Sequence, residues 1–363
     1  MGIKFSSINK NKFVKGIKFL CVGTALSLVL SGCNKTNVNT TKSTTSPATQ
    51  TTTSDHIEEV TTPTTLTTIK TVDKKTGLDL NINEIHISKK EVSVYNSDFE
   101  ISEKTKNKIN KTIKNYGGDC SFIAINLNDG MCFGYNIDKS YPTASTIKAA
   151  VSLYAFKEMD NGNGNLDELK VYEERFRRGG SGILKNKKSG TSYSLKDLFY
   201  YTINYSDNVA YYMIHDRFYS NNYNTFLKDL GCDQLYLKNG ARWGKINARS
   251  MAIIWQEIYK YKDETENSKY LFELLTNAEY NYIEEGMENY ESAHKSGWTP
   301  TETHDSGIVF GPDDYIVVTL NNNNGNYAAK SQLLKISSSI ETVIDEYELY
   351  KKNNLNKQKQ LTR

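Results

Sequence analysis

Cysteine and histidine are scarce in this chain, and neither is grouped. The 363 residues include five cysteines and five histidines, and no cluster of them has the spacing of metal ligands. The sequence therefore predicts no metal and no cofactor.

A surplus of positive charge is also missing, because 45 basic side chains are balanced by 42 acidic ones. No basic patch stands out, so we expect no nucleic-acid partner.

The apolar run from Phe19 to Leu30 is too short to span a bilayer comfortably. Five lysines and no acidic residue precede Cys33, so removal of this segment would change the net charge from +3 to −2. The segment ends in Leu-Ser-Gly-Cys33, which resembles the lipobox of bacterial lipoproteins. The resemblance implies a signal peptide over residues 1–32 and lipidation of Cys33. The mature protein is then held on the outer face of the cytoplasmic membrane. The alternative is an ordinary signal peptide in which Cys33 has no role.

Composition divides the remaining chain into four parts. Residues 33–77 are rich in Thr and Ser and poor in large apolar side chains, so we expect a disordered tether. Residues 78–100 carry short alternating runs and are an N-terminal extension of open role. Residues 101–352 are the folded domain, expected to be a monomer, and residues 353–363 are a polar tail.

Two of the cysteines flank a predicted β-hairpin. Cys120 is the first residue of one strand, over 120–127, and Cys132 is the second residue of the next, over 131–136, with Asp129-Gly130 as the turn between them. A two-residue turn places Leu127 opposite Cys132, with Cys120 far down the first strand. The sequence therefore predicts no disulfide between these two cysteines.

The hydrophobic pattern predicts strands at both ends of the domain and helices between them. A helix is expected over 101–116, a hairpin over 120–136, mainly helices over 195–284, strands over 291–298, 307–310 and 315–320, and a closing helix over 328–350. We therefore expect one sheet built from both ends of the chain, with a helical lobe inserted in the middle.

The segment from Tyr141 to Phe156 carries the strongest chemical signal. Its second half is apolar and small, which is typical of a buried helix, and Ser145 stands where that helix should begin. Lys148 follows one turn later on the same face. An amine held in a low-dielectric helix end loses its proton more readily and can act as a base toward a serine nucleophile. We interpret Ser145 as a nucleophile and Lys148 as its activator.

Two further triplets stand in a consistent order behind this pair. Ser206-Asp207-Asn208 falls inside a helical pattern, and Lys295-Ser296-Gly297 falls on a predicted strand, where Gly297 allows close backbone approach. The same short patterns recur at Ser220-Asn221-Asn222 and at Lys188-Ser189-Gly190. Both of these lie in polar stretches that we interpret as solvent-facing turns.

The three motifs together resemble the penicillin-recognising serine enzymes, and class A β-lactamases most. The resemblance covers residues 101–350, including Gly180-Ser-Gly-Ile-Leu184 between the first two motifs and Asp305-Ser-Gly-Ile-Val309 after the third. It implies an α/β fold of the β-lactamase/transpeptidase type. In that fold an antiparallel sheet of roughly five strands is flanked by helices, an all-helical lobe is inserted, and the site lies between the two.

The resemblance also implies roles for the catalytic residues. Ser145 would attack an amide carbonyl to form an acyl-enzyme, Lys148 would shuttle its proton, and Ser206 would relay a proton to the leaving nitrogen. The backbone N–H groups of Ser145 and Trp298 would form the oxyanion hole.

Substrate binding is implied for the other motif residues. Asn208 would hydrogen-bond the amide of the substrate side chain. Lys295 and Ser296 would face the substrate carboxylate, because a fixed cation and a hydroxyl suit an anion. Gly297 and Trp298 would line the same strand edge.

One expected residue is missing. Class A β-lactamases carry a glutamate, on a loop after the Ser-Asp-Asn helix, that activates the deacylating water, whereas residues 231–247 here contain no glutamate. Without a general base the acyl-enzyme should be long-lived. Three functions stay open: a slow class A-like β-lactamase, a D-alanyl-D-alanine peptidase or transpeptidase acting on peptidoglycan stem peptides, and a non-catalytic β-lactam-sensing or wall-binding lipoprotein.

Overall fold

The computed structural model describes residues 77–361, except 116–118, 239 and 323–325. The predicted signal peptide, Cys33 and all but the last residue of the predicted tether lie outside the described residues. Within the described part of the chain, no helix is both long enough and apolar enough to cross a membrane.

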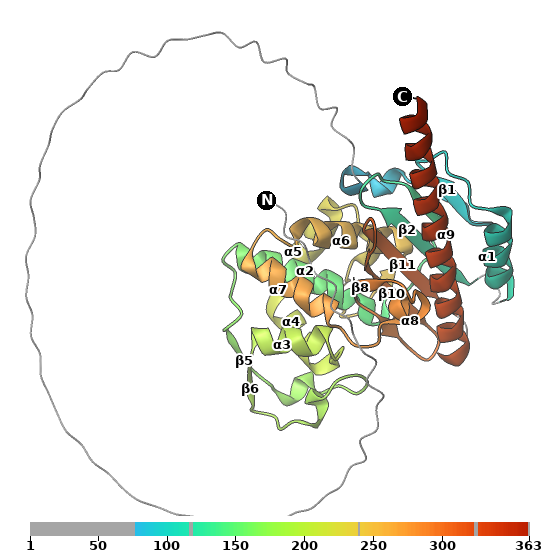
Figure 1. Cartoon of the computed structure of the whole chain (residues 1–363). Helices are drawn as coiled ribbons and strands as arrows, with labels where there is room; N and C mark the ends of the chain where they lie inside the picture. Colours follow the sequence, from blue (N-terminus) through green and yellow to red (C-terminus); the bar gives the residue numbers. More distant parts are fainter. Residues whose placement is uncertain (1–76, 116–118, 239, 323–325, 362–363) are drawn as a thin grey trace, which may run out of the picture. The chain divides into compact units, whose positions relative to one another are not determined.

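The centre of the domain is an antiparallel sheet of seven strands (Figure 1). Six strands follow the order β1-β3-β2-β11-β10-β8, and β9 pairs with β10 as well. The direct pairing of β2 with β11 joins the two ends of the domain, which confirms the sheet that the sequence predicted. The strands are β1 Ser93–Tyr95, β2 Cys120–Asn126, β3 Cys132–Tyr135, β8 Glu291–His294, β9 Gly297–Trp298, β10 Thr303–Phe310 and β11 Tyr315–Asn321.

Both faces of this sheet are covered, and alternate residues of one strand enter different cores. In β2, Ile123 and Ile125 belong to one hydrophobic cluster, whereas Phe122 and Ala124 belong to the other. This is the two-residue periodicity of a strand. Because both sets are apolar, the strand reads as a continuous apolar run and is buried throughout.

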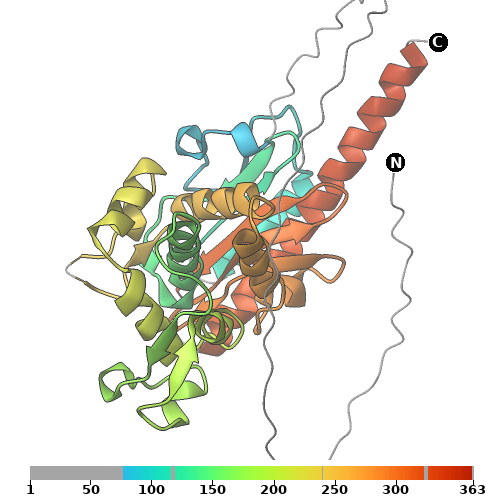
Figure 2. The ribbon, with the colours of Figure 1, turned by 90° about the vertical axis from the view of Figure 1, so that its left-hand side faces the viewer.

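Helices from the two chain ends cover one face, and the inserted helices cover the other (Figures 1 and 2). The first group is α1 Glu103–Asn115, α8 Tyr282–Gly286 and α9 Asn326–Leu361. The second group is α2 Ile147–Asp160, α3 Leu195–Ile203, α4 Asn208–Phe218, α5 Asn221–Asp229, α6 Ala248–Tyr261 and α7 Glu266–Thr276. Two small sheets pair β4 Tyr141–Pro142 with β7 Lys245–Ile246, and β5 Leu169–Val171 with β6 Ser192–Ser194.

The hairpin between β2 and β3 turns earlier than predicted. Asn126 accepts the backbone N–H groups of Asn128 and Asp129 through its side chain, and its own backbone N–H donates to Met131. The loop therefore has four residues instead of two, and Cys132 pairs with Ile125, not with Leu127. Cys120, Cys132 and Cys232 are buried as free thiols.

The boundaries drawn at residues 100 and 352 do not separate structural units. Ile82 and Ile85, from the N-terminal extension, lie in the same core as the inserted helices, and β1 pairs with β3. Arg249 of α6 donates hydrogen bonds to the carbonyls of both isoleucines. At the other end α9 continues through the predicted polar tail to Leu361, because residues 353–361 contain no helix breaker, and this last part is exposed almost throughout.

Candidate active site

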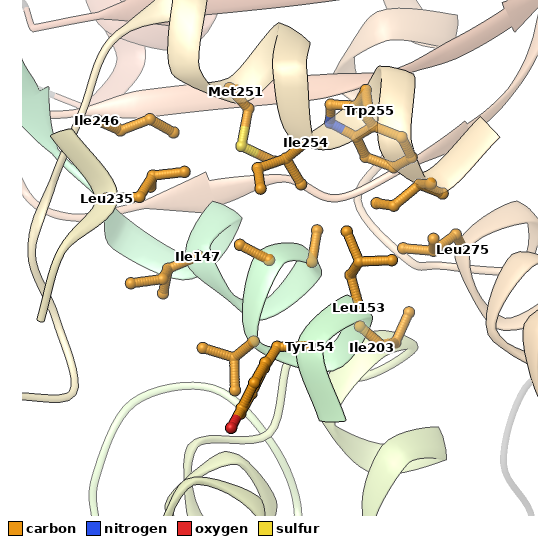
Figure 3. Packing of buried hydrophobic residues seen from close by; sticks show 14 of the residues in the cluster. Ile147, Leu153, Tyr154, Ile203, Leu235, Ile246, Met251, Ile254, Trp255 and Leu275 are labelled. Atoms are coloured by element: carbon orange, nitrogen blue, oxygen red, sulfur yellow. The ribbon is translucent and has the colours of Figure 1, made fainter. Parts of the chain in front are cut away.

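Ser145 lies in the short turn that leads into α2. The single 3-10 turn Ala144–Thr146 passes directly into the helix, and Ala144 adopts a left-handed backbone conformation with φ of 44°. The helix is buried on every side from Ile147 to Phe156, so its position is fixed by packing. Figure 3 shows Ile147 and Leu153 among the buried side chains of this core. Ser145 itself is half-buried.

Lys148 is completely buried, and its Nζ lies within hydrogen-bonding distance of three oxygen atoms of the neighbouring motif. Its Nζ lies 2.6 Å from the Ser206 carbonyl, 3.2 Å from Ser206 Oγ and 2.9 Å from Asn208 Oδ1. In the described residues none of its hydrogen bonds goes to Ser145, which stands one turn earlier on the same helix face. The structure thus brings the first and second motifs together through this one amine.

The surroundings of Lys148 favour its neutral form. Burial lowers its pKa well below the usual value, and the nearby Lys295 cation lowers that pKa further. The rings of Tyr211 and Trp243, each centred 5.6 Å from Nζ, and the Asp207 carboxylate oppose this shift. The net direction is that of a lysine prepared to accept a proton.

The second motif does not lie inside a helix, as the apolar pattern had suggested. Helix α3 ends at Ile203 and α4 begins at Asn208, and Ser206 adopts φ of 50° in the turn between them. This left-handed conformation is costly for a serine. It places the carbonyl and the hydroxyl of Ser206 on the same amine.

Asp207 holds this turn together, a role that the sequence analysis did not assign. Its buried carboxylate caps α4 by accepting the N–H groups of Val209 and Ala210, and it accepts those of Ile183 and Leu184 as well. The available signal was an aspartate directly before an apolar helical run, which is typical of an N-cap.

The third motif interrupts its strand. Strand β8 ends at His294 and β9 begins at Gly297, so Lys295 and Ser296 lie in the break. Lys295 is buried, and its Nζ donates to the Ser296 carbonyl at 2.9 Å. Burial lowers the pKa of Lys295 to about 8, and the Asp305 carboxylate acts against this shift.

Gly297 allows β9 to lie against the start of α2. A Cβ atom at this position would stand 2.5 Å from the backbone nitrogen of Ser145 and 2.7 Å from that of Thr146. Any side chain would therefore push the strand away from the nucleophile. Trp298 follows with 49% of its surface exposed.

His304 links β10 to the segment that leads into Ser145, and no local pattern in the sequence indicates this contact. Its Nδ1 accepts the N–H of Asn321 at 3.2 Å, so its Nε2 donates to the Pro142 carbonyl at 3.0 Å. Burial lowers the pKa of His304 to about 4, which matches a neutral ring with one donor and one acceptor.

These elements enclose a pocket of about 360 Å³. Its lining consists of Pro142, Thr143, Ala144, Ser145, Gly180, Ser181, Asn208, Trp243, Gly244, Trp298, Thr299 and Pro300. No charged side chain belongs to this lining, and Lys148, Ser206, Lys295 and Ser296 are buried behind it. Nowhere in the described residues do three His, Cys, Asp or Glu side chains gather to hold a metal.

Comparison with known proteins identifies this arrangement. Residues 104–344 match the model of the β-lactamase enzyme family. A stretch of 127 residues is 26% identical to β-lactamase SME-1 of Serratia marcescens. This stretch spans 35% of the chain and 43% of that relative, so less than half of the relative's length is matched.

Solved structures give the same fold. A mutant of PBP-A in an acyl-enzyme complex with penicillin G superposes with a TM-score of 0.60 at 19% identity, covering 66% of this chain and 97% of PBP-A. A β-lactamase from Sphaerobacter thermophilus gives a TM-score of 0.59 at 18% identity, over 64% of this chain and 95% of that one. Both likenesses show a β-lactamase/transpeptidase-like fold. Because the family model matches well over half of this chain, the chain belongs to the β-lactamase enzyme family.

Proposed function

We propose that the chain is a serine hydrolase that β-lactams acylate at Ser145 and that releases the acyl group slowly. The observation that carries this proposal is the shared environment of Ser145, Lys148 and Ser206. Ser145 lines the pocket. The buried Nζ of Lys148, one helical turn after Ser145, lies 3.2 Å from Ser206 Oγ.

Acylation would proceed through these groups in sequence. Ser145 Oγ attacks the carbonyl carbon of the lactam while its proton passes to the neutral amine of Lys148. As the tetrahedral intermediate collapses, the carbon–nitrogen bond breaks and the nitrogen takes a proton from Ser206 Oγ. Ser206 recovers its proton from Lys148, so the amine ends neutral.

The remaining motif residues would hold the ligand. Lys295 and Ser296 supply a cation and a hydroxyl for the carboxylate, and Asn208 supplies an amide for the side chain of the substrate. The backbone N–H groups of Ser145 and Trp298 would bind the oxyanion, a contribution of about two to three powers of ten per donor. The close approach of β9 to Ser145, which leaves no room for a Cβ atom at Gly297, supports this assignment.

Slow release of the acyl group rests on the segment 231–247. It contains no glutamate, and the part of it that reaches the pocket is Trp243 and Gly244, neither of which can activate a water molecule. A general base is worth about two to four powers of ten in rate. We therefore expect deacylation to be slower than acylation, so that the acyl-enzyme accumulates.

The second candidate is a D-alanyl-D-alanine peptidase or transpeptidase that acts on stem peptides of peptidoglycan. It uses the same acylation chemistry. The structural likeness to PBP-A, which carries an acyl-enzyme with penicillin G in a mutant form, favours it. A non-catalytic sensor or wall-binding protein is the third candidate.

A time course of intact-mass spectra after addition of benzylpenicillin tests the proposal. We expect one adduct per chain, formed rapidly and lost slowly, and no adduct on Ser145→Ala. With a chromogenic cephalosporin a burst should precede slow turnover. An alanine variant that labels as well as the native chain would exclude Ser145 as the nucleophile. Rapid sustained hydrolysis would show a deacylating base that we have not identified, and an unlabelled native chain would favour a non-catalytic role.

We further propose that Cys33 anchors the protein by a lipid to the outer face of the cytoplasmic membrane, as its lipobox-like context indicates. Expressed in a bacterium, the full chain should fractionate with membranes and Cys33→Ala should be soluble. Equal membrane recovery of the two would contradict lipid anchoring at this residue.

A further inference from the structure

Two arginine side chains meet at one aromatic ring beside the pocket. The guanidinium carbon of Arg178 lies 4.5 Å from the centre of the Tyr212 ring, and that of Arg242 lies 4.7 Å from it. Such contacts orient planar cations against an aromatic face. Arg178 stands two residues before Gly180 and Arg242 directly before Trp243, and both of these neighbours line the pocket.

These two arginines differ from the others nearby because neither has an acidic partner among the residues that the structure describes. Arg175 is paired with Asp216 at 2.7 Å, and Arg177 is paired with Glu174. Among the described residues, Arg178 forms no ion pair, and its Nη1 donates only to backbone carbonyls.

Arg242 carries a second sign of an unfilled site. Its Nε is buried and has no hydrogen-bond partner in the described part of the chain. A buried donor without an acceptor is costly. Its guanidinium group also forms no ion pair with any described carboxylate, so two unpaired cations stand on one ring.

The surrounding segment strengthens the positive field. Residues 173–188 contain six basic and two acidic side chains. Both acidic side chains are already paired with arginines, Glu173 with Arg175 and Glu174 with Arg177. An anion that reaches this region beside the pocket therefore meets cations that no described carboxylate neutralises.

We propose that Arg178 and Arg242 form a subsite for a carboxylate on the acyl arm of the ligand, which is the part that stays on Ser145 after acylation. This inference rests on the proposed function. The acyl arm is favoured because Asn208, assigned to the amide of that arm, lies on the same wall and donates to the Gly179 carbonyl at 2.9 Å. Arginine suits this task because its planar fork matches a carboxylate.

A matched pair of penicillins tests the subsite. Benzylpenicillin and carbenicillin differ by one carboxylate on the carbon next to the side-chain amide. The second-order rate constants of acylation are measured for both on the native chain, on Arg178→Gln, on Arg242→Gln and on the double variant. For each protein, the rate constant with carbenicillin is divided by the rate constant with benzylpenicillin. This ratio is then divided by the ratio of the native chain. This quotient cancels the intrinsic reactivities of the two penicillins.

We expect the ratio to fall about threefold in each single variant and about tenfold in the double variant, since exposed and half-buried ion pairs are weak individually. Raising the salt from about 0.05 to about 0.5 M should lower the native ratio as well. Arg177→Gln is the control, because this arginine lies on the same segment but is neutralised by Glu174. Its ratio should stay at the native value. An unchanged ratio in the double variant overturns the proposal.

Two precautions keep the test decisive. If Arg242→Gln does not fold, Arg178→Gln carries the comparison, because its side chain is exposed on a loop. If benzylpenicillin fails to acylate the native chain, the proposed function fails. The subsite is then tested by calorimetric titration of both penicillins into Ser145→Ala with and without the arginine changes. Equal affinities for carbenicillin in that experiment overturn the subsite independently.

A peptide pair separates the two sources of such a ligand. Two acetylated peptides that end in D-alanyl-D-alanine, with glutamate or glutamine as the preceding residue, are compared as competitors of acylation. Arginine-dependent preference for the glutamate peptide assigns the subsite to an acidic wall peptide. A preference confined to the penicillins assigns it to acidic antibiotic arms, and no preference in either pair overturns it.

Discussion

Replacing Lys148 with methionine is expected to slow acylation of Ser145 by about three powers of ten, since a general base contributes that much. In the described structure the amine is the titratable group that hydrogen-bonds to Ser206. Methionine has a similar length and no proton affinity, so it removes the base and keeps the volume. Loss of the hydrogen bonds of Lys148 opposes the gain from removing a buried polar group, and we expect the melting temperature to change by only a few degrees.

The pH dependence gives this prediction a sharper form. A lowered pKa means that the neutral base is already available at a lower pH than for an ordinary lysine, so the rate should rise as Lys148 loses its proton and then level off. Above about 8, the pKa of Lys295, the cation that holds the ligand carboxylate is lost and the rate should fall. In Lys148→Met the acylation rate should no longer increase with pH, but it should still decrease above about pH 8.

The measurement is the acylation rate by benzylpenicillin between pH 5 and pH 10, followed by mass spectrometry. Lys157→Met is the matched control, because this lysine lies on the same helix and is paired with Glu257 at 2.8 Å. It should acylate as the native chain does. Native rates in Lys148→Met would place the base elsewhere.

Replacing Asp207 with alanine should lower the free energy of unfolding by about 3–5 kcal/mol, because several hydrogen bonds to a buried carboxylate are lost at once. The carboxylate accepts four backbone N–H groups, at 2.6, 2.7, 2.8 and 3.0 Å. The substitution removes this acceptor from all four donors, which is costly for those that are buried. The turn that carries Ser206 should loosen at the same time, and acylation should slow.

Asp207→Asn separates the two halves of this role. Its oxygen can still cap α4 through Val209 and Ala210, whereas its NH₂ group cannot accept from Ile183 and Leu184. We expect roughly half of the alanine effect. Chemical denaturation measures both variants, with Ser194→Ala as the control, because Ser194 caps the start of α3 by accepting the N–H of Asp197 and its loss is expected to cost about 1 kcal/mol. If Asp207→Ala costs no more than that control, the network does not support the turn.

The sheet and the helical lobe could be predicted because their signals are local and repeated. The apolar runs of β2 and β11 and the buried helix after Ser145 are strong patterns, and the order of the three motifs indicated the family. The register of the β2–β3 hairpin was missed because the Asn126 side chain, not the Asp129-Gly130 pair, starts the turn.

The site was predicted less completely because its geometry depends on distant parts of the chain. Ser206 was placed in a helix because the apolar pattern does not show that Asp207 also binds the backbone at residues 183 and 184. His304 reaches back 162 positions to the Pro142 carbonyl, and the two unpaired arginines come from separate loops. Such contacts leave no periodic trace in a sequence.

The pairing of β2 with β11 has a consequence for how the molecule is made. Asn126 pairs with Tyr315, and Cys120 pairs with Asn321. The middle of the sheet therefore joins two segments that the ribosome synthesises at very different times. Until the last part of the polypeptide has emerged from the ribosome, one side of β2 offers unsatisfied backbone groups. Chains that stop short of Tyr315 thus carry an open edge on which a second unfinished copy can dock.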